Sequence, residues 1–370
     1  MQGDGADRPR ARDLGLDFGG SPGPCNAITD VGGVQVGYTT LIDGTGPLSV
    51  GHGPVRTGIT AILPRPSGGP LTPVWAGFHA LNGNGEMTGT HWIRHGGHFS
   101  GPVCLTNTHS VGTVHDAVTS WMLQTWSADF EREHLWAMPV VAETYDGVLN
   151  DINGQHITRR HALDAIHSAR GGTIAEGNVG GGTGMIAYEY KGGTGTASRT
   201  LSIGGADHTL GVLVQANHGL REWFTVLGVP IGKHWPEGRL FDTERGSIIV
   251  VIACDLPMLP HQLERLAQRA SIGIGRHGTP GGNNSGDLFL AFSTANAVPL
   301  AELTSAPRRM KVLPDDWFDP IYLAAVQAID EAVVNAMLAA ESMTTLKPAG
   351  LTCQSLEAQR LVALLGTGGA

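Results

Sequence analysis

One stretch, residues 244–253, does most to limit how this chain can fold, because it joins a charged turn, a glycine and a serine to six consecutive apolar residues. A run of that length, rich in β-branched residues and bounded by a turn, predicts a buried strand. Gly246 and Ser247 are then expected where a loop enters the core. A serine at such a position is usually only a hydroxyl at the edge of a strand, so a nucleophile there requires partner residues elsewhere in the chain.

Further strand-like runs and helical patterns surround this strand. Runs separated by Gly/Pro turns predict strands at residues 34–41, 55–63, 74–80, 136–141, 185–190, 199–203, 209–215, 223–231 and 288–293. Apolar residues at helical spacing predict helices over residues 113–126, 159–169, 261–272 and 320–341. Residues 1–30, rich in Gly, Pro and charge, predict an extended arm, and the residues from 342 on are weakly patterned. With no linker visible, the pattern favours a single α+β domain over residues 1–370, with helices covering stacked sheets.

Glycine is unusually frequent, at 54 of 370 residues, which is about twice its average share. It gathers in clusters such as G-G-T-G without a fixed period, so collagen is excluded and tight turns between short strands are favoured. Neither G-G-T-G cluster fits a phosphate-binding motif, and neither opens a helix after a strand with an acidic residue about 20 positions further on. A nucleotide site is therefore not favoured, and no cofactor is expected.

The charge balance limits the partners. The net charge is −9 and no run of Lys and Arg is present, whereas nucleic acid and anionic membranes require a basic surface. No segment is seen to approach the roughly 18 apolar residues of a membrane span, and residues 1–14 are polar, without the apolar core of a signal peptide. The four cysteines are far apart and predict reduced thiols. We therefore expect a cytoplasmic protein without a nucleic-acid or membrane partner.

Three histidines could be mistaken for a metal site. His91, His95 and His98 are spaced so that they could share one helical face. Gly96 and Gly97 interrupt that helix, and the metalloprotease motif H-E-x-x-H is absent from the sequence. Ordinary histidines are favoured, and no metal is expected.

The segment 281–287, directly before a predicted strand, has two interpretations that spacing alone leaves open. Its Asn and Asp residues are typical of a turn in which side chains cap backbone amides. Alternatively, Ser285 and Asp287 form a hydrogen-bonded hydroxyl–carboxylate pair that holds or polarises a second serine.

Long segments of the chain resemble the DmpA-like family, the L-aminopeptidase/D-amidase-esterases among the N-terminal-nucleophile hydrolases. The likeness runs from about residue 10 to residue 345. The matching segments are L-N-G-N-G-E-M-T-G (81–89), T-N-T-H-S-V-G (106–112), A-E-G-N-V-G-G-G-T-G-M (175–185), K-G-G-T-G-T-A-S-R (191–199), V-L-V-Q-A-N (212–217), G-S-I-I-V-V (246–251) and N-S-G-D-L-F-L-A-F-S-T-A-N (284–296).

This resemblance implies a four-layer αββα sandwich and a precursor that cleaves itself between Gly246 and Ser247 into chains 1–246 and 247–370. It also implies a tetramer of the processed heterodimers. Ser247 would be the nucleophile of a self-processing aminopeptidase or amidase acting on short peptides, amides or esters. The other site residues that it implies are the pair Ser285 and Asp287, the oxyanion-stabilising Asn217, Lys191, and Glu143, which would receive the free amine of the substrate.

The sequence departs from the family pattern at two places. The β-aminopeptidase members carry Glu where this chain has Asp287, which is one methylene shorter. A tyrosine used by some members has no certain counterpart, with Val148 in its place and Tyr145 close by. These departures leave open a β-aminopeptidase, or a hydrolase of ω-amino-acid oligomers, on the same machinery.

The chemistry of the mapped serine is consistent with this role. A serine hydroxyl needs a base, and cleavage before Ser247 would free an α-amine whose ordinary pKa of about 7.7–8.0 suits that task. In the precursor this nitrogen is an amide, so Ser285, oriented by Asp287, is the candidate for assisting the first cut. Two rivals remain: an acyltransferase of the ornithine-acetyltransferase type, which usually has a threonine nucleophile, and an unprocessed homologue without catalytic activity.

Overall fold

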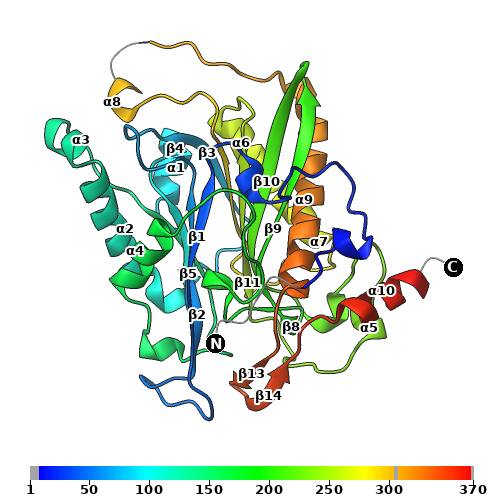
Figure 1. The fold of residues 1–370 in the computed structure, drawn as a ribbon. Coiled ribbons are helices and arrows are strands. Elements are labelled where there is room, and N and C mark those ends of the chain that lie inside the picture. The colour runs from blue at the N-terminus through cyan, green and yellow to red at the C-terminus, as the bar shows by residue number, and fades with distance from the viewer. Residues whose placement is uncertain (1–7, 304–306, 368–370) are drawn as a thin grey trace.

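The structure, a computed structural model, describes residues 8–303 and 307–367. Two main β-sheets lie between layers of helices (Figure 1). The first has the order β1-β2-β5-β6, formed by β1 (Gln35–Asp43), β2 (Val55–Leu63), β5 (Val103–Asn107) and β6 (Val140–Thr144). The second has the order β4-β3-β12-β11-β10-β9, formed by β4 (His98–Phe99), β3 (Val74–Ala80), β12 (Leu288–Ser293), β11 (Ser247–Cys254), β10 (Ala206–Asn217) and β9 (Gly193–Ile203).

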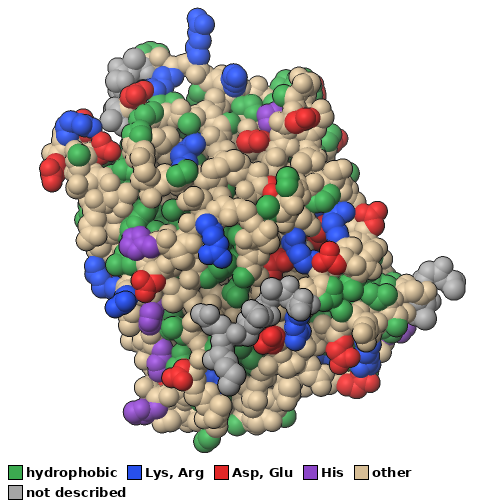
Figure 2. Space-filling model, in the orientation of Figure 1, with side chains coloured by type: hydrophobic (Ala, Val, Ile, Leu, Met, Phe, Trp, Pro, Cys, Tyr) green, Lys and Arg blue, Asp and Glu red, His purple; other side chains and the backbone are tan. Residues whose placement is uncertain are grey.

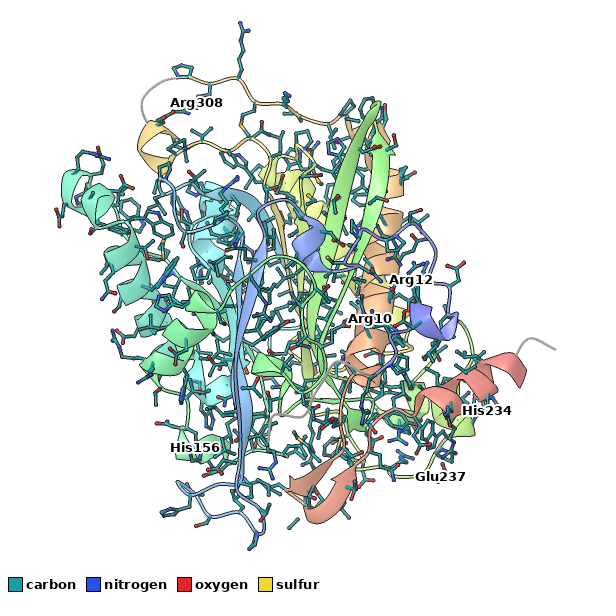
Figure 3. The ribbon with its side chains drawn as sticks, viewed as in Figure 1. Arg10, Arg12, His156, His234, Glu237 and Arg308 are labelled. Atoms are coloured by element: carbon teal, nitrogen blue, oxygen red, sulfur yellow. The ribbon has the colours of Figure 1, made fainter. Side chains whose placement is uncertain are left out.

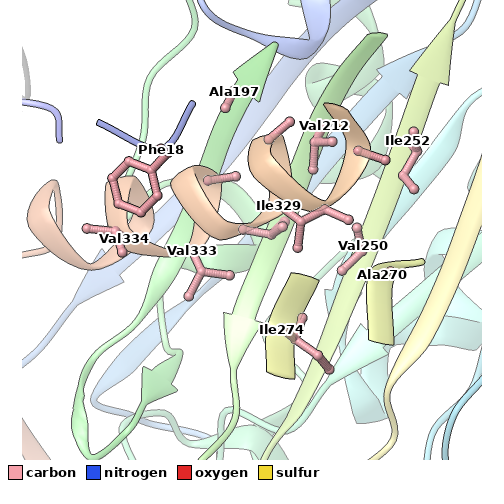
Figure 4. Close-up of a cluster of buried hydrophobic side chains, with 14 of the residues drawn as sticks. Phe18, Ala197, Val212, Val250, Ile252, Ala270, Ile274, Ile329, Val333 and Val334 are labelled. Carbon is pink, nitrogen blue, oxygen red and sulfur yellow. The ribbon is translucent and has the colours of Figure 1, made fainter. Parts of the chain in front are cut away.

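Helices cover the outer face of each sheet. The four-stranded sheet packs against α2 (Val111–Thr125) and α4 (Arg159–His167). The six-stranded sheet packs against α6 (Pro260–Gln268), α7 (Ala270–Gly275) and α9 (Phe318–Leu338), and Figure 4 shows part of that apolar cluster. A third cluster joins the inner faces of the two sheets. This arrangement confirms the predicted α+β fold with four αββα layers.

Five further α-helices lie in the described part of the chain. They are α1 (Thr90–Gly96), α3 (Ser127–Arg132), α5 (Ile231–His234), α8 (Leu300–Leu303) and α10 (Ala358–Thr367). Two small sheets complete the fold, one of β7 (Ile186–Ala187) and β8 (Tyr190–Lys191), the other of β13 (Met343–Leu346) and β14 (Ala349–Cys353).

The apolar run after Ser247 forms β11, as predicted. Successive side chains of a strand point to opposite faces of the sheet, and both faces of β11 are covered by apolar layers, so every residue of the run is apolar. Ile248, Val250 and Ile252 face the helices, whereas the residues between them face the other sheet. All are fully buried, and each large aliphatic side chain contributes about 1.5–3 kcal/mol to folding. Since β11 pairs with β12 in parallel and with β10 antiparallel, Ser247 begins a strand at the centre of the sheet.

Several predicted elements differ from the structure. Residues 223–231 do not form a strand, because Gly228 (φ 83°) and Pro230 turn the chain, and a 3-10 turn and α5 flank the turn. The run at 185–190 is split into β7 and β8 by Tyr188 and Glu189, both with positive φ. The predicted strand 136–141 starts only at Val140, and the predicted helix 261–272 is two helices, α6 and α7. Beyond residue 342, where the pattern is weak, β13, β14 and α10 form.

The N-terminal arm is anchored by two arginines, labelled in Figure 3. Arg12 pairs with Glu331 of α9 at 2.9 Å, and the buried Arg199 of β9 pairs with the same carboxylate at 2.8 Å. Arg10 pairs with Glu176 at 2.7 Å and donates a hydrogen bond to a backbone carbonyl of β9. The arm is therefore attached to the six-stranded sheet; its first seven residues lie outside the described part of the chain.

Helix α9 corrects one expectation about membranes. By length and composition alone, the helical segment Asp315–Leu338, which contains an 18-residue window with a mean hydropathy of 1.4, is apolar enough to cross a bilayer. In the structure 89% of that window is buried, because α9 packs on the six-stranded sheet through one face and on α7 and the arm through others. Burial inside the protein accounts for its apolar composition.

The glycine clusters serve close packing as well as turns. Gly180, Gly181 and Gly182 form a buried 3-10 turn between the two sheets. A Cβ atom on Gly181 would lie 2.0 Å from Gln215 Oε1, and one on Gly182 would lie 2.2 Å from Thr194 N. No larger residue fits either position.

The charged surface and the cysteines complete the description. On the face shown in Figure 2, acidic and basic side chains are interspersed. The four cysteines are free, and all but Cys25 are buried.

Candidate active site

Ser247 lies in the six-stranded sheet where β10 ends and β12 begins. It is the first residue of β11 and stands opposite Asn217, the last residue of β10. Its side chain is nearly buried, and its Oγ accepts a hydrogen bond from Gly286 N at 3.0 Å. Because β12 runs parallel to β11, the turn that precedes β12 reaches the same edge of the sheet as Ser247.

Ser285 and Asp287 form the hydrogen-bonded pair that was one of two interpretations of this turn. Ser285 Oγ donates to Asp287 Oδ1 at 2.5 Å, and Ile248 N donates to the same oxygen at 3.2 Å. Asn82 Nδ2 donates to Asp287 Oδ2 at 3.2 Å. Burial raises the pKa of Asp287, while these donors oppose the rise. Asp287 is thus tied to both Ser285 and the residue after Ser247.

Asn217 is held on both sides of its amide. Its Oδ1 accepts from Ile186 N at 2.8 Å, and its Nδ2 donates to Tyr145 O at 3.0 Å. An amide nitrogen has two hydrogens, so one remains for another acceptor. The side chain is therefore fixed beside Ser247 with donor capacity left.

Gly246 cannot be replaced without moving the backbone. A Cβ atom at this position would lie 1.6 Å from Asn217 O and 2.6 Å from its carbonyl carbon. The peptide bond between Gly246 and Ser247 is thereby pressed against the end of β10. Glycine is the residue type that permits this approach.

Glu143 approaches the site from the other sheet. It lies on β6, where its Oε1 accepts from Glu86 N at 3.0 Å and its Oε2 accepts from Thr108 Oγ1. Burial raises the pKa of Glu143, and these two donors counteract the rise. A Cβ atom on Gly85 would lie 3.5 Å from Glu143 Oε1 and 3.2 Å from Gly286 Cα, so only the loop at Gly85 separates this carboxylate from the Ser285–Asp287 turn.

Lys191 is fully buried on β8. Its Nζ donates to Gly192 O at 2.9 Å and to Gly182 O at 3.3 Å. Burial lowers the pKa of Lys191 to about 7. Lys191 pairs with Ile186, the residue whose amide holds Asn217, so the lysine lies one strand pair away from the asparagine.

A small pocket opens beside Gly246. Apolar residues line it together with Asn217 and Arg245. Tyr145 and Val148, the two residues considered as counterparts of the family tyrosine, are both among the lining residues. The full lining is Tyr145, Val148, Gly184, Ile186, Asn217, His218, Gly219, Phe241, Arg245 and Gly246.

Three contributors to the site were not singled out from the sequence. Asn82 binds Asp287, Thr108 binds Glu143, and the backbone amide of Gly286 binds Ser247. Each lies in one of the segments that carry the family resemblance, which is the signal that could have found them.

The spaced histidines do not share a face. His91 and His95 lie on α1, whereas His98 lies on β4, because Gly97 (φ 72°) ends the helix between them. Within residues 8–303 and 307–367, no group of three or more His, Cys, Asp or Glu side chains is arranged to hold a metal ion.

The layered sheets, with a serine opening a central strand beside an asparagine and a hydroxyl–carboxylate pair, have the fold of the N-terminal-nucleophile hydrolases. A solved structure with this fold, the L-aminopeptidase D-Ala-esterase/amidase from Ochrobactrum anthropi, matches with a TM-score of 0.93 and 54% identity, over 98% of this chain and 99% of that one. The model of peptidase family S58 matches residues 26–349, and the chain belongs to that family.

Other relatives agree on the class of reaction. The β-peptidyl aminopeptidase BapA of Sphingosinicella microcystinivorans is 51% identical over 97% of this chain and 92% of its own length. A Burkholderia β-aminopeptidase structure matches with a TM-score of 0.86 and 43% identity, over 98% of this chain and 99% of that one. The protein is a hydrolase of peptide bonds, of the aminopeptidase kind.

Proposed function

We propose that the chain is a self-processing serine aminopeptidase that releases N-terminal amino acids from short peptides, amides or esters, with Ser247 as its N-terminal nucleophile. One observation carries the proposal. Ser247 begins a central strand, between Asn217 and the Ser285–Asp287 turn, after a glycine packed so tightly that no other residue fits.

In the first reaction, Ser247 Oγ attacks the carbonyl carbon of Gly246. The Oγ proton passes to the departing Ser247 nitrogen, assisted by Ser285, and the peptide bond becomes an ester. Water then hydrolyses the ester and leaves a carboxylate on Gly246 and a free α-amine on Ser247. The Gly286 amide already donates to Ser247 Oγ, so it stabilises negative charge on that oxygen as the attack begins.

In the processed enzyme, the α-amine of Ser247 acts as the base for its own hydroxyl. Ser247 attacks the carbonyl carbon of the first residue of a substrate, the amide bond that follows this residue breaks, and the free hydrogen of Asn217 Nδ2 stabilises the oxyanion. One donor of this kind contributes about 3–4 kcal/mol to the transition state. Lys191 holds the carbonyls of Gly182 and Gly192, which fixes the glycine-rich segment behind Asn217.

Glu143 explains why the enzyme would act only at an N-terminus. Its carboxylate is nearly buried and receives two hydrogen bonds that favour the ionised form. A substrate ammonium would pair with this carboxylate next to the Gly85 loop. The distance from Glu143 to Ser247 would then fix how far the attacked carbonyl lies from the free amine of the substrate. A peptide without a free amine would leave this buried charge unpaired, at a cost of several kcal/mol.

The test is the mass of the purified protein and of the Ser247→Ala variant. We expect wild type to yield two chains with a new N-terminus at Ser247, and the variant to remain one chain of 38.8 kDa. A wild-type protein that is active as one unbroken chain, or a variant that still divides at this bond, would contradict the proposal.

A second candidate is supported by the names of the relatives, since two that are 51% and 46% identical are β-peptidyl aminopeptidases. β-Amino acids place one more methylene between the amine and the attacked carbonyl, so the distance from Glu143 to Ser247 decides which substrates fit. A panel of α-, β- and ω-amino-acid amides distinguishes the two. Higher kcat/KM for the β-amides assigns the chain to the second candidate.

We also propose, on the family resemblance, that processed heterodimers assemble into tetramers in the cytoplasm. The four free cysteines are compatible with a reducing compartment. Light scattering of the purified protein and fractionation of the native cells test the two parts separately.

A further inference from the structure

The segment that leads to the cleavage site is mostly exposed, yet one acidic residue in it is buried. Arg239, Asp242, Thr243 and Arg245 are exposed, whereas Glu244 is only 7% exposed. Burying a carboxylate costs free energy unless its oxygens meet donors or a cation. Its position, three residues before Ser247, therefore calls for an explanation.

The Glu244 carboxylate lies between the two loops that flank Ser247. Its Oε1 accepts a hydrogen bond from Gly219 N at 2.6 Å, just beyond Asn217 and the end of β10. On its other side it faces Gly282, where a Cβ atom would lie 1.8 Å from Oε2. Among the described residues Oε2 makes no hydrogen bond of normal geometry, so the contact with the Gly282 backbone is electrostatic.

Gly282 is the base of the turn that carries the hydroxyl–carboxylate pair. Its carbonyl accepts hydrogen bonds from Ser285 N at 2.9 Å and from Asn82 Nδ2 at 3.1 Å. The same Asn82 nitrogen also donates to Asp287. Glu244 thus contacts the loop after Asn217 on one side and the root of the Ser285–Asp287 turn on the other.

This geometry also explains why the residue is an acid. Two backbone segments approach its two oxygens, and a carboxylate presents acceptors on both sides, whereas an amide presents one acceptor and one donor. Burial raises the pKa of Glu244; the Gly219 amide lowers it, the charge of Asp287 raises it, and the Gly282 backbone lowers it. Tyr188 also interacts with Glu244, since burial and then the charge of Glu244 raise the pKa of this tyrosine.

We propose that Glu244 is a positioning residue for self-cleavage, which fixes the segment before the scissile bond between the loops that carry Asn217 and the Ser285–Asp287 pair. Since Ser247 is held by strand pairing, anchoring Glu244 leaves only Arg245 and Gly246 between two fixed points. The Gly246 carbonyl is then held where Ser247 Oγ attacks it. This role rests on the proposed self-processing of the chain.

The experiment follows precursor conversion over time, by gel and intact mass, after a pulse of cell-free translation. The chains compared are wild type, Glu244→Gln and Glu244→Ala, with Asp242→Asn as the matched control two residues upstream. We expect both Glu244 variants to cleave more slowly by about tenfold or more at neutral pH, since a displacement near 1 Å costs that much or more. The control is expected to cleave at the wild-type rate.

A pH series separates positioning from a general loss of structure. Glutamine resembles the protonated acid, so the ratio of wild-type to Glu244→Gln rates is expected to shrink toward one as the pH falls through the raised pKa of Glu244. Loss of folding would slow the variant by the same factor at every pH and would lower its melting temperature.

The outcomes distinguish the two proposals. If wild type never divides, the proposed self-processing fails, and the role of Glu244 fails with it. If wild type cleaves itself and Glu244→Gln does so equally fast, only the positioning role is overturned. The same holds if the ratio of the wild-type to the Glu244→Gln cleavage rate is independent of pH.

Discussion

Replacing Gly246 by alanine tests the packing at the cleavage site directly. In the structure a Cβ atom at this position would lie 1.6 Å from Asn217 O, 2.6 Å from Asn217 C and 3.0 Å from His218 Cα. Ordinary contact begins near 3.4 Å, so the segment or the end of β10 must separate by about 1.8 Å. Both partners are backbone, and no side-chain rotation can relieve the contact.

The size of the effect follows from that displacement. A shift of about 1 Å in a reacting group reduces a rate by about a hundredfold, which corresponds to about 2.7 kcal/mol. We therefore expect the Gly246→Ala precursor to cleave at least about a hundredfold more slowly than wild type, although Ser247, Ser285 and Asp287 are unchanged. Overpacking of this kind also destabilises folding by about 1–3 kcal/mol.

The assay is the time course of precursor conversion, with the melting temperature measured on the same samples. Gly112→Ala is the matched control, because a Cβ atom there meets nothing within 4 Å and the position lies on the helix α2. It is expected to cleave at the wild-type rate and to be as stable or slightly more stable. Conversion of Gly246→Ala at the wild-type rate would refute the view that this contact aligns the scissile bond.

Three further predictions concern other parts of the structure. Ser285→Ala removes the hydroxyl that Asp287 orients and is expected to slow self-cleavage by about tenfold or more; unchanged conversion would exclude Ser285 from the first cut. Glu143→Gln is expected to cleave itself at the wild-type rate but to lose about tenfold or more in kcat/KM for amides with a free amine. Equal turnover by wild type and this variant would exclude the contact between Glu143 and the substrate ammonium. For Glu176, burial raises the pKa from 4.5 to about 7, against the opposing charge of Arg10. Its folded pKa exceeds its unfolded pKa, so stability falls as the pH rises across that interval, and denaturation of Glu176→Gln should show a flatter pH dependence than wild type.

The sequence pattern within a single segment was enough to predict those strands and helices whose apolar residues follow a clear period. The apolar run after Ser247 predicted β11, and the helical spacing around Val118 and Ile329 predicted α2 and α9, which form within a few residues of the predicted bounds. The run at 223–231 is also largely apolar, and Phe224 and Val226 are buried in the core. Burial alone does not require strand pairing, and the turn at Gly228 prevents it.

The site was predicted less completely, because its geometry depends on contacts between distant segments. Family motifs pointed to Ser247, Asn217 and the Ser285–Asp287 pair, which the structure brings to one edge of the sheet. Nothing local shows that the backbone amide of Gly286 faces Ser247 Oγ. The burial of Lys191 and Glu244 likewise comes from segments that are far away in the sequence.

The order of strands in the larger sheet has a consequence for the protein after the proposed cut. β11 and β12 lie downstream of residue 246, and their neighbours β10 and β3 lie upstream. The two strands of the 247–370 fragment would therefore lie between strands of the 1–246 fragment, and Glu331 of the former would pair with Arg12 and Arg199 of the latter. The two fragments would separate only when the protein unfolds. Refolding would then require the two fragments to meet in solution, so it would depend on their concentration. Dilution should thus lower the melting midpoint of divided protein and leave that of the uncut Ser247→Ala chain unchanged.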